Sequence, residues 1–167
     1  MEKWFEENRE LLIKELKKKD IIFKAMIEQL PDMLWFKDSE GKYIYANKAI
    51  RDNLLFEDNP IGKTDIEVAK KNKEIQGDSN FTFGEVCGNS DKDMLENQYT
   101  SKEYIESGKV KGKMLHLAVN KTIVKLDGEI LGVVGSGRDI TIYREKLIQS
   151  NQEDVFKINE FENKDIK

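Results

Sequence analysis

Apolar side chains in the first thirty residues recur at alternating steps of four and three, which is the spacing of one face of an α-helix. Glutamate and lysine fill most of the positions between them, and Pro31 disfavours a helical conformation at the residue before it. The pattern therefore predicts one amphipathic helix over residues 1–30. Its stripe consists of Phe5, Arg9, Leu12, Leu16, Lys19, Phe23, Met26 and Leu30. Two interpretations stay open: the helix packs on its own domain, or the stripe forms a parallel coiled coil between two chains.

From residue 33 onward the apolar period changes to two, which is typical of β-strands. Turn residues at Asp38–Gly41 and the Asp127-Gly128 pair favour hairpins, so neighbouring strands should pair antiparallel. The pattern predicts five strands: Met33–Lys37, Tyr43–Ala46, Thr100–Glu106, Lys113–Val124 and Ile130–Arg138.

Short helices are predicted between the second and third strands. Asn47 is a suitable N-cap for a helix to about Leu54, because its side chain can accept a hydrogen bond from an unpaired helical N–H. Thr64 or Asp65 can cap another helix near Ile66–Lys73 in the same way.

Residues 74–98 are rich in Gly, Asn, Ser and Asp, and we interpret them as an irregular insertion with one short helix at Asp91–Gln98. After the last strand, Thr141 can cap a final helix from Ile142 to about Ser150. The chain thus divides into an N-terminal helix (1–30), a central domain (31–141) and a C-terminal helix with a polar tail (142–167).

Three of the predicted strands carry apolar residues on both faces: Met33–Phe36, Met114–Val119 and Ile130–Val134. An antiparallel sheet with one solvent-exposed face alternates apolar and polar residues, so both faces of this sheet should be covered. The short central helices can cover one face, and the N-terminal helix of the same chain or of a partner can cover the other. The expected fold class is α+β, a five-stranded antiparallel sheet with short helices on one face.

Composition narrows the functional classes. The net charge of −4, from 28 basic and 32 acidic residues, gives no electrostatic reason to expect nucleic-acid binding. One cysteine and one histidine exclude a disulfide framework and any metal motif built on a histidine pair. The longest uncharged stretch has eight residues, whereas a membrane span needs about 20, and residues 1–19 lack a secretory signal. We expect a cytoplasmic protein that binds or regulates and is not an enzyme.

Four segments carry a resemblance to a known family. They are Leu30-Pro31-Asp32 with Trp35–Gly41, Tyr45–Ala49, Ile61–Asp65, and Gly132–Thr141 with its closing Asp139-Ile140-Thr141. In this order and spacing, over residues 30–144, they resemble the PAS sensor-domain family. The resemblance implies that the sheet and its helices enclose a small-molecule pocket, and that flanking helices couple this pocket to an output module.

The resemblance also implies a role in signal transduction, since such domains occur in bacterial histidine kinases of two-component systems, diguanylate cyclases and chemoreceptors. We therefore expect a sensor that forms a homodimer through its N-terminal helix and acts on an output domain, such as a kinase or cyclase, in cis or in trans. Two alternatives remain: a ligand-free dimerisation module, and a small α+β lyase or isomerase that uses His116 with an acidic residue.

Candidate ligand-binding residues lie on the strands that should form the pocket floor. They are Trp35, Lys37, Tyr45, Leu117, Val119, Gly135 and Gly137. The two glycines share one face of a strand and leave space for a ligand or for a neighbouring helix. Lys37, in an apolar run, can meet a ligand carboxylate or phosphate, or it can be an ion-paired or snorkelling lysine. Asp139 and Thr141 are candidates for a cap that relays strand movement to the final helix.

His116 and Cys87 are interpreted as structural. The apolar set Leu115, Leu117 and Val119 looks like the core-facing side of its strand, which turns His116 to the other face. Cys87 lacks the local sequence of flavin-linking PAS relatives, and the predicted helix at Ile66–Lys73 lacks the axial histidine of haem-binding ones. We therefore expect a small organic molecule or anion as ligand, without haem, flavin, metal or catalytic residues.

Overall fold

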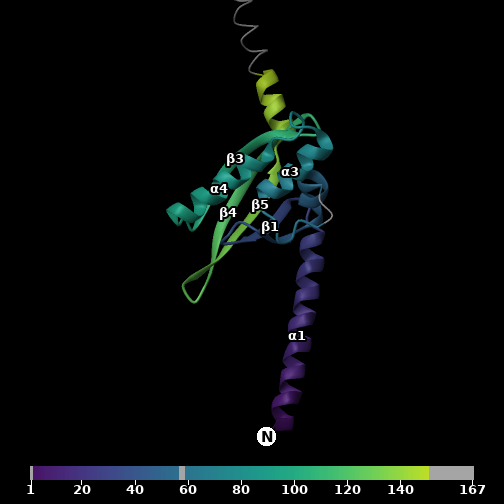
Figure 1. The fold of residues 1–167 in the computed structure, drawn as a ribbon, viewed down its shortest axis with the longest axis vertical. Coiled ribbons are helices and arrows are strands. Elements are labelled where there is room, and N and C mark those ends of the chain that lie inside the picture. The colour runs from purple at the N-terminus through teal and green to yellow at the C-terminus, as the bar shows by residue number, and fades with distance from the viewer. Residues whose placement is uncertain (1, 57–58, 151–167) are drawn as a thin grey trace, which may run out of the picture.

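The computed structural model describes residues 2–56 and 59–150, with strands and helices in the order expected from the sequence. The elements are α1 (Glu2–Glu28), β1 (Met33–Asp38), β2 (Tyr43–Ala46), α2 (Lys48–Ile50), the π-helical turn η1 (Arg51–Leu55), α3 (Asp65–Gln76), α4 (Phe83–Asn97), β3 (Ser101–Val110), β4 (Lys113–Leu126) and β5 (Glu129–Asp139). Residues 141–150 form a further helix. Figure 1 shows α1 and this last helix leaving the domain at opposite ends.

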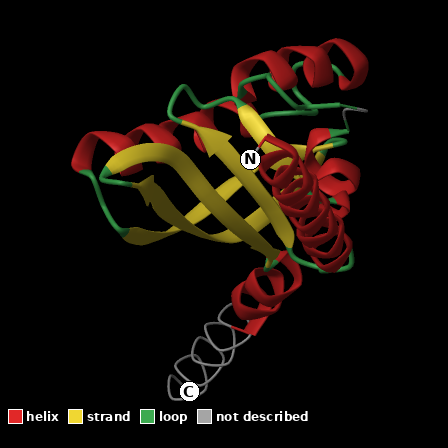
Figure 2. Ribbon diagram, turned by 90° about the horizontal axis from the view of Figure 1, so that it is seen from below, coloured by secondary structure: helices red, strands yellow, loops and turns green. Residues whose placement is uncertain are grey.

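The five strands form one antiparallel sheet in the order β2-β1-β5-β4-β3. The chain's last strand, β5, thus lies in the middle of the sheet, between β1 and β4. Figure 2 shows the strands as one curved sheet with helices beside it. The expected fold class, a five-stranded antiparallel α+β sheet with flanking helices, is confirmed.

One face of the sheet is buried beneath α2, η1, α3 and α4. Leu117 and Val119 point to this face and are 0% and 2% exposed, while His116, which precedes Leu117, is half-buried and points to the other face. The predicted phase of β4 is therefore confirmed. The main core consists of Met33, Trp35, Tyr43, Ala46, Ile50, Leu54, Leu55, Val68, Ala69, Phe81, Phe83, Cys87, Val110, Leu117 and Val119.

Helix α1 extends away from the domain rather than packing on it (Figure 1). Leu12, Leu16, Phe23 and Met26 of the predicted stripe are 58–67% exposed, and in the described part of the helix Ile27 is the buried apolar residue. The interpretation that α1 packs on its own domain is therefore wrong for this chain. Among the described residues, no helix of the same chain covers the outer face of the sheet, so the expected cover of that face by a partner chain stays a prediction.

The C-terminal end of α1 is nevertheless held firmly by the domain. Glu28 accepts hydrogen bonds from the Tyr45 hydroxyl (2.9 Å), the Lys48 backbone N–H (2.8 Å) and the Arg51 guanidinium (3.1 Å). Asn47 caps α2 and donates to the backbone carbonyls of Ile27 and Asp32. These contacts fix the position of the last turn of α1 at the edge formed by β2 and α2.

The expected irregular insertion at 74–98 is wrong. Helix α3 continues to Gln76, and α4 occupies fifteen residues, Phe83–Asn97, instead of the predicted short helix at Asp91–Gln98. Gly84 allows α4 to approach α3 closely, because a Cβ there would lie 2.2 Å from the Cβ of Ala69. Small and polar residues usually indicate a loop, but in α4 they serve other purposes: Gly84 allows close packing against α3, and Ser90 and Asp91 form buried hydrogen bonds and ion pairs. Tertiary contacts therefore override the local helix propensity of this segment. No helix in the described part of the chain is long and apolar enough to cross a membrane.

Candidate functional site

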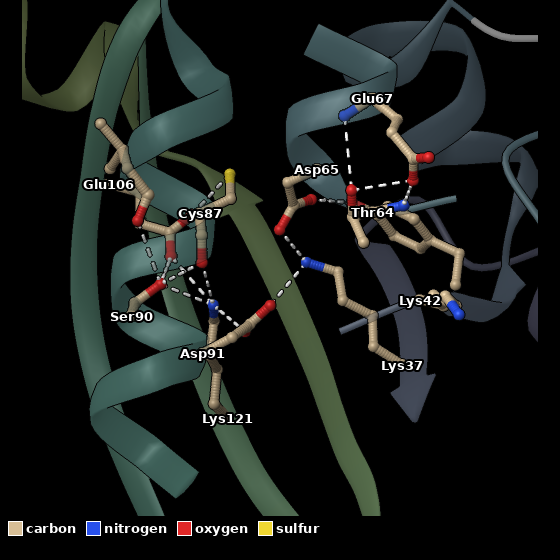
Figure 3. A network of polar contacts seen from close by, with 12 residues as sticks. Lys37, Lys42, Thr64, Asp65, Glu67, Cys87, Ser90, Asp91, Glu106 and Lys121 are labelled. Atoms are coloured by element: carbon tan, nitrogen blue, oxygen red, sulfur yellow. Dashed lines mark hydrogen bonds and ion pairs between the residues drawn. The ribbon is translucent and has the colours of Figure 1, made fainter. Parts of the chain in front are cut away.

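Five ionisable side chains lie buried between the sheet and helices α3 and α4 (Figure 3). They are Lys37 of β1, Glu106 of β3, Lys121 of β4, Asp65 at the start of α3 and Asp91 of α4, all at most 8% exposed. Lysine, glutamate and aspartate are almost never fully buried unless they are paired. We call these five residues the charged cluster.

Asp91 joins the two lysines of the charged cluster. One carboxylate oxygen, Oδ2, is 2.6 Å from the Lys37 ammonium, and the other, Oδ1, accepts from the Lys121 ammonium. The Lys37 ammonium also donates to Asp65, and the Lys121 ammonium lies 3.2 Å from Oε1 of Glu106. Ion pairs therefore run without interruption from α3, through β1, α4 and β4, to β3.

Neutral polar groups complete the bonding of the charged cluster. The Tyr43 hydroxyl donates to Oδ1 of Asp65 at 2.6 Å, and the Ser90 hydroxyl and Cys87 thiol donate to Glu106. Lys121 also donates to Oγ of Ser90 at 2.6 Å and to the backbone carbonyl of Cys87 at 3.3 Å. All three protons of the Lys121 ammonium therefore have acceptors within the protein.

Aromatic rings flank both ammonium groups. The Lys37 nitrogen lies 4.6 Å from the centre of the Tyr43 ring. The Lys121 nitrogen lies 5.9 Å from the Trp35 ring and 5.8 Å from the Tyr104 ring. These distances fall within the range in which a cation is attracted to the face of an aromatic ring.

The electrostatics of the interior keep Lys37 charged and the Cys87 thiol neutral. Burial disfavours the Lys37 ammonium, but the carboxylates of Asp65 and Asp91 outweigh it and raise the pKa of Lys37. Burial would raise the pKa of Asp91, yet the two lysines lower it. Burial, together with the nearby carboxylate of Glu106, raises the pKa of the Cys87 thiol, which is the state expected of an unreactive cysteine.

Helix geometry explains how single residues reach the charged cluster. Thr64 caps α3 through a reciprocal capping box with Glu67, which fixes the first turn and with it Asp65. On α4, Cys87, Ser90 and Asp91 are three and four residues apart, so they lie on one face of the helix.

Among the predicted ligand residues, the structure brings together Trp35, Lys37, Leu117 and Val119 on the inner face of the sheet. The space above Gly135 and Gly137 is taken by the Trp35 ring. A Cβ on Gly135 would lie 2.3 Å from this ring, and one on Gly137 would lie 3.3 Å from it. The strand glycines therefore accommodate a side chain of the same domain, which neither the ligand nor the helix interpretation anticipated.

Tyr45 does not belong to this site, and Tyr43 takes its place. Strict alternation puts both tyrosines on one face of β2, but a β-bulge shifts the register between Phe36 and Lys37 of the paired strand. Tyr43 consequently faces the charged cluster at 1% exposure, while Tyr45 turns outward and donates to Glu28. Partial burial, together with this hydrogen bond to Glu28, raises the pKa of Tyr45 to about 12.

The predicted partner of Lys37, a ligand carboxylate or phosphate, is replaced by carboxylates of the chain itself. The ion-paired alternative is the observed one. Sequence reasoning missed Tyr43, Asp65, Ser90, Asp91, Glu106 and Lys121. A signal existed for Lys121, which follows Leu117 and Val119 at a spacing of two and so shares their inward face.

One buried donor in the site has no partner. The indole N–H of Trp35, a residue only 4% exposed, forms no hydrogen bond, and among the described residues it is the one buried side-chain nitrogen or oxygen in this condition. Leaving such a group unpaired costs about 1–3 kcal/mol, so it marks a point where an acceptor from outside the chain would be favoured.

Asp139 and Thr141 both form hydrogen bonds where β5 passes into the last helix. Oδ1 of Asp139 accepts from the Thr141 backbone N–H at 2.8 Å, so Asp139 is the side chain that caps the turn. The Thr141 hydroxyl instead accepts from the backbone N–H of His116 on β4, at 2.9 Å. Asp139 thus joins the last helix to β5, and Thr141 joins it to β4.

A curved five-stranded antiparallel sheet, covered on one face by helices that enclose a polar interior, defines a small α+β domain. A sequence profile of the PAS fold matches residues 27–145, more than half of the chain. The chain therefore belongs to the PAS fold family.

Solved structures similar to this chain include PAS domains. The phage VqmA–DPO complex has a TM-score of 0.56 and 19% identity, covering 84% of this chain and 60% of that one. The PAS domain of BvgS from Bordetella pertussis has a TM-score of 0.57 and 18% identity, covering 82% and 97%. The PAS domain of an HTR-like protein from Haloarcula marismortui has a TM-score of 0.54 and 17% identity, covering 78% and 99%. At these identities the likeness shows the fold alone, and comparison with curated proteins gives no match.

Proposed function

We propose that this PAS domain is a sensory module that binds a small organic molecule in its interior and relays the bound state through its two flanking helices. The observation that carries this proposal is the charged cluster. A protein in which well-packed apolar residues replace a buried ion-pair network is often as stable as the original or more stable. Stability alone therefore does not account for five buried charged residues. Ionisable groups with perturbed pKa values are also typical of functional sites.

The arrangement of donors and acceptors favours an uncharged polar ligand over a bare anion. Asp91 already occupies the position between the two ammonium groups, so an anion would have to displace its carboxylate. The Trp35 N–H, by contrast, has no acceptor within the described residues. A ligand that offers an acceptor to Trp35 would satisfy this donor, and the DPO bound to phage VqmA shows that a similar fold holds a ligand.

Native mass spectrometry of freshly purified protein tests ligand binding directly. We expect a bound mass on the wild-type chain that Trp35→Phe loses, because phenylalanine keeps an aromatic ring and removes the N–H. Tyr143→Phe, at an exposed position of the last helix, is the matched control and should retain the mass. A folded wild-type chain without any bound mass would contradict the proposal, and a haem or flavin mass would contradict the expected ligand class.

We further propose that the chain is a homodimer through α1, with an output domain such as a kinase or cyclase in cis or in trans. The exposed stripe of α1 and the outer sheet face, where Ile105 is 59% exposed, support a second chain as their cover. Light scattering should give a dimer for wild type and a monomer for Leu12→Glu with Leu16→Glu. The control, Lys14→Glu with Lys18→Glu, changes charge outside the stripe and should stay dimeric. A wild-type monomer at tens of micromolar would refute the dimer.

One observation favours a second candidate, a ligand-free dimerisation module. The Trp35 ring already fills the space above Gly135 and Gly137. This candidate predicts a dimer in light scattering together with no bound mass. The lyase or isomerase alternative is not supported in the same way, because His116 and the buried carboxylates lie on opposite faces of the sheet.

A further inference from the structure

A cavity of about 440 Å³ opens at the end of the sheet where the two flanking helices join the domain. This volume lies within the range of small-molecule sites, about 300–1,000 Å³. The start of β1, the end of η1 and the β3–β4 hairpin supply its apolar wall, which includes Met33, Phe56, Val110 and Leu115. We call it the end cavity. None of the five residues of the charged cluster lines it, so it is separate from the interior site.

Four charged side chains line the end cavity, and its acids are engaged whereas its bases are not. Asp52 forms an ion pair with the Lys48 ammonium, and Oδ1 of Asp139 accepts from a backbone N–H at the start of the last helix. Within the described part of the chain, neither the Lys111 nor the Lys113 ammonium forms an ion pair. The end cavity therefore presents two cations without a counterion beside an apolar wall.

Two residues of the end cavity hold backbone conformations that are rare for their type. Phe56 follows the π-helical turn η1 with a φ of 46°, and Lys111 has a φ of 51°. Left-handed backbone is unfavourable for such side chains, and both strained residues and π-helical turns are frequent at functional sites. These two residues meet: the Lys111 ammonium lies 4.1 Å from the centre of the Phe56 ring. The strained segments thus place a cation and an aromatic ring at one opening.

We propose that the end cavity binds an organic anion with an apolar body, such as a carboxylate on a hydrocarbon chain. The apolar body packs against Met33, Phe56 and Leu115, and the carboxylate accepts from the ammonium groups of Lys111 and Lys113. An organic cation would be repelled by these lysines, because both aspartates are already engaged. An inorganic anion would leave the apolar wall in water. The wall and the lysines together therefore select an amphipathic anion.

The position of the end cavity connects this ligand to both flanking helices. Pro31, which follows α1 closely, lines the cavity, and so does Asp139, whose carboxylate caps the last helix. A ligand that occupies the cavity therefore contacts the two junctions through which a PAS domain would act on an output module. This second site goes beyond the interior ligand proposed above, because it uses other residues and another ligand class.

Octanoate is a suitable probe, since it joins a carboxylate to an apolar chain, and methionine methyl signals in nuclear magnetic resonance of the full chain report its position. Met33 and Met114 line the end cavity, whereas Met26 lies on α1 and Met94 in a separate buried cluster. We expect octanoate to shift the first two signals saturably and to leave the other two unchanged. No shift of Met33 at millimolar octanoate would overturn the proposal.

Uncharged and cationic analogues of the probe test the role of the lysines. 1-Octanol and octylammonium have the same chain as octanoate without its charge, so they should bind about tenfold more weakly or worse. Equal affinity for 1-octanol would show a merely apolar cavity, and tighter binding of octylammonium would reverse the assigned charge. Either result would refute the anion site.

A pair of double variants completes the test. Lys111→Gln with Lys113→Gln should weaken octanoate binding about tenfold, because two partly exposed ion pairs are lost. The matched control, Lys109→Gln with Lys125→Gln, removes two exposed lysines outside the end cavity and should leave the affinity unchanged. Equal affinity in the two double variants would refute the site. Both should keep the bound mass expected for the interior ligand, so the two proposals fail independently.

Discussion

Lys37→Met tests the charged cluster most directly, because it removes one of the two lysines that pair with three buried carboxylates. Lys37 is 1% exposed and contributes the ammonium partner of Asp65. Its removal leaves Asp65 with the hydrogen bond from the Tyr43 hydroxyl and leaves Asp91 paired with Lys121 alone. Breaking a buried pair from one side costs about 3–5 kcal/mol, so we expect a loss of stability of that order.

Urea unfolding followed by far-ultraviolet circular dichroism measures this loss. With a slope of about 2 kcal/mol per molar for a domain of this size, the midpoint should fall by roughly 2 M. Lys42→Met is the matched control: its ammonium is exposed and pairs with the exposed Glu40, so its loss should be far smaller. Lys37→Met combined with Asp65→Asn should recover much of the stability, because the asparagine oxygen still accepts from Tyr43 and no unpaired charge remains.

The pH dependence of Lys37→Met gives an independent check of its cause. In the wild type, the lysines hold the pKa of Asp91 below its ordinary value against the effect of burial. Without Lys37 that opposition weakens, so the folded-state pKa of Asp91 rises, and its protonation relieves a buried carboxylate that has lost one of its two ammonium partners. The stability difference between wild type and variant should therefore shrink as the pH falls from about 7 to about 5. A loss equal to that of Lys42→Met, or no recovery by Asp65→Asn, would refute the buried ion-pair network.

Three further substitutions test other parts of the structure. Gly135→Ala should lower the free energy of unfolding by about 1–3 kcal/mol and perturb the near-ultraviolet circular dichroism of Trp35, because the new Cβ would lie 2.3 Å from the indole ring. Gly88→Ala is the control: its Cβ would point into open space on α4, so it should be neutral or stabilising in the same urea titration. Arg51→Met should accelerate amide hydrogen exchange in the last turn of α1 by removing two bonds to Glu28, and unchanged exchange there would contradict the anchoring. Asp139→Ala should lower the free energy of unfolding by about 1 kcal/mol, because the cap of the last helix is lost. Amide hydrogen exchange in the helix at 141–150 should be faster in this variant than in the control Ser136→Ala, which lies on the same strand.

Local sequence patterns predicted the strands well, because a strand's period depends only on its own residues. All five strands lie where alternation placed them, with shifts at their ends; β3 runs on to Val110 instead of ending at Glu106. The fold class followed from these strands and from the hairpin turns between them. Helix α4 was missed because its composition of Gly, Asn, Ser and Asp reflects contacts with α3 and with the charged cluster, which no local rule contains.

The candidate site could be predicted only where a residue contrasts with its own neighbours. Lys37 stands out in an apolar strand, and so it was found. Its partners Asp65 and Asp91 lie 28 and 54 residues away in a helix start and in a segment interpreted as irregular, so nothing near Lys37 pointed to them. Tyr43 was exchanged for Tyr45 because a bulge changes the face of a strand without leaving a clear trace in its alternation.

The position of the two lysines connects the interior to the C-terminal helix. Lys37 pairs across the sheet with Val133, and Lys121 pairs with Gly135, so the lysines hold the strands on both sides of β5. Asp91 links β1 and β4, the two strands that flank β5, through their lysines, and β5 ends at Asp139, close to the start of the helix at 141–150. A ligand that takes over a bond of Asp91 would loosen β1 from β4 while leaving the backbone pairing intact. We propose that β5, the strand between them, then shifts at its C-terminal end, where Asp139 caps the helix, and that this shift couples the interior site to the flanking helix.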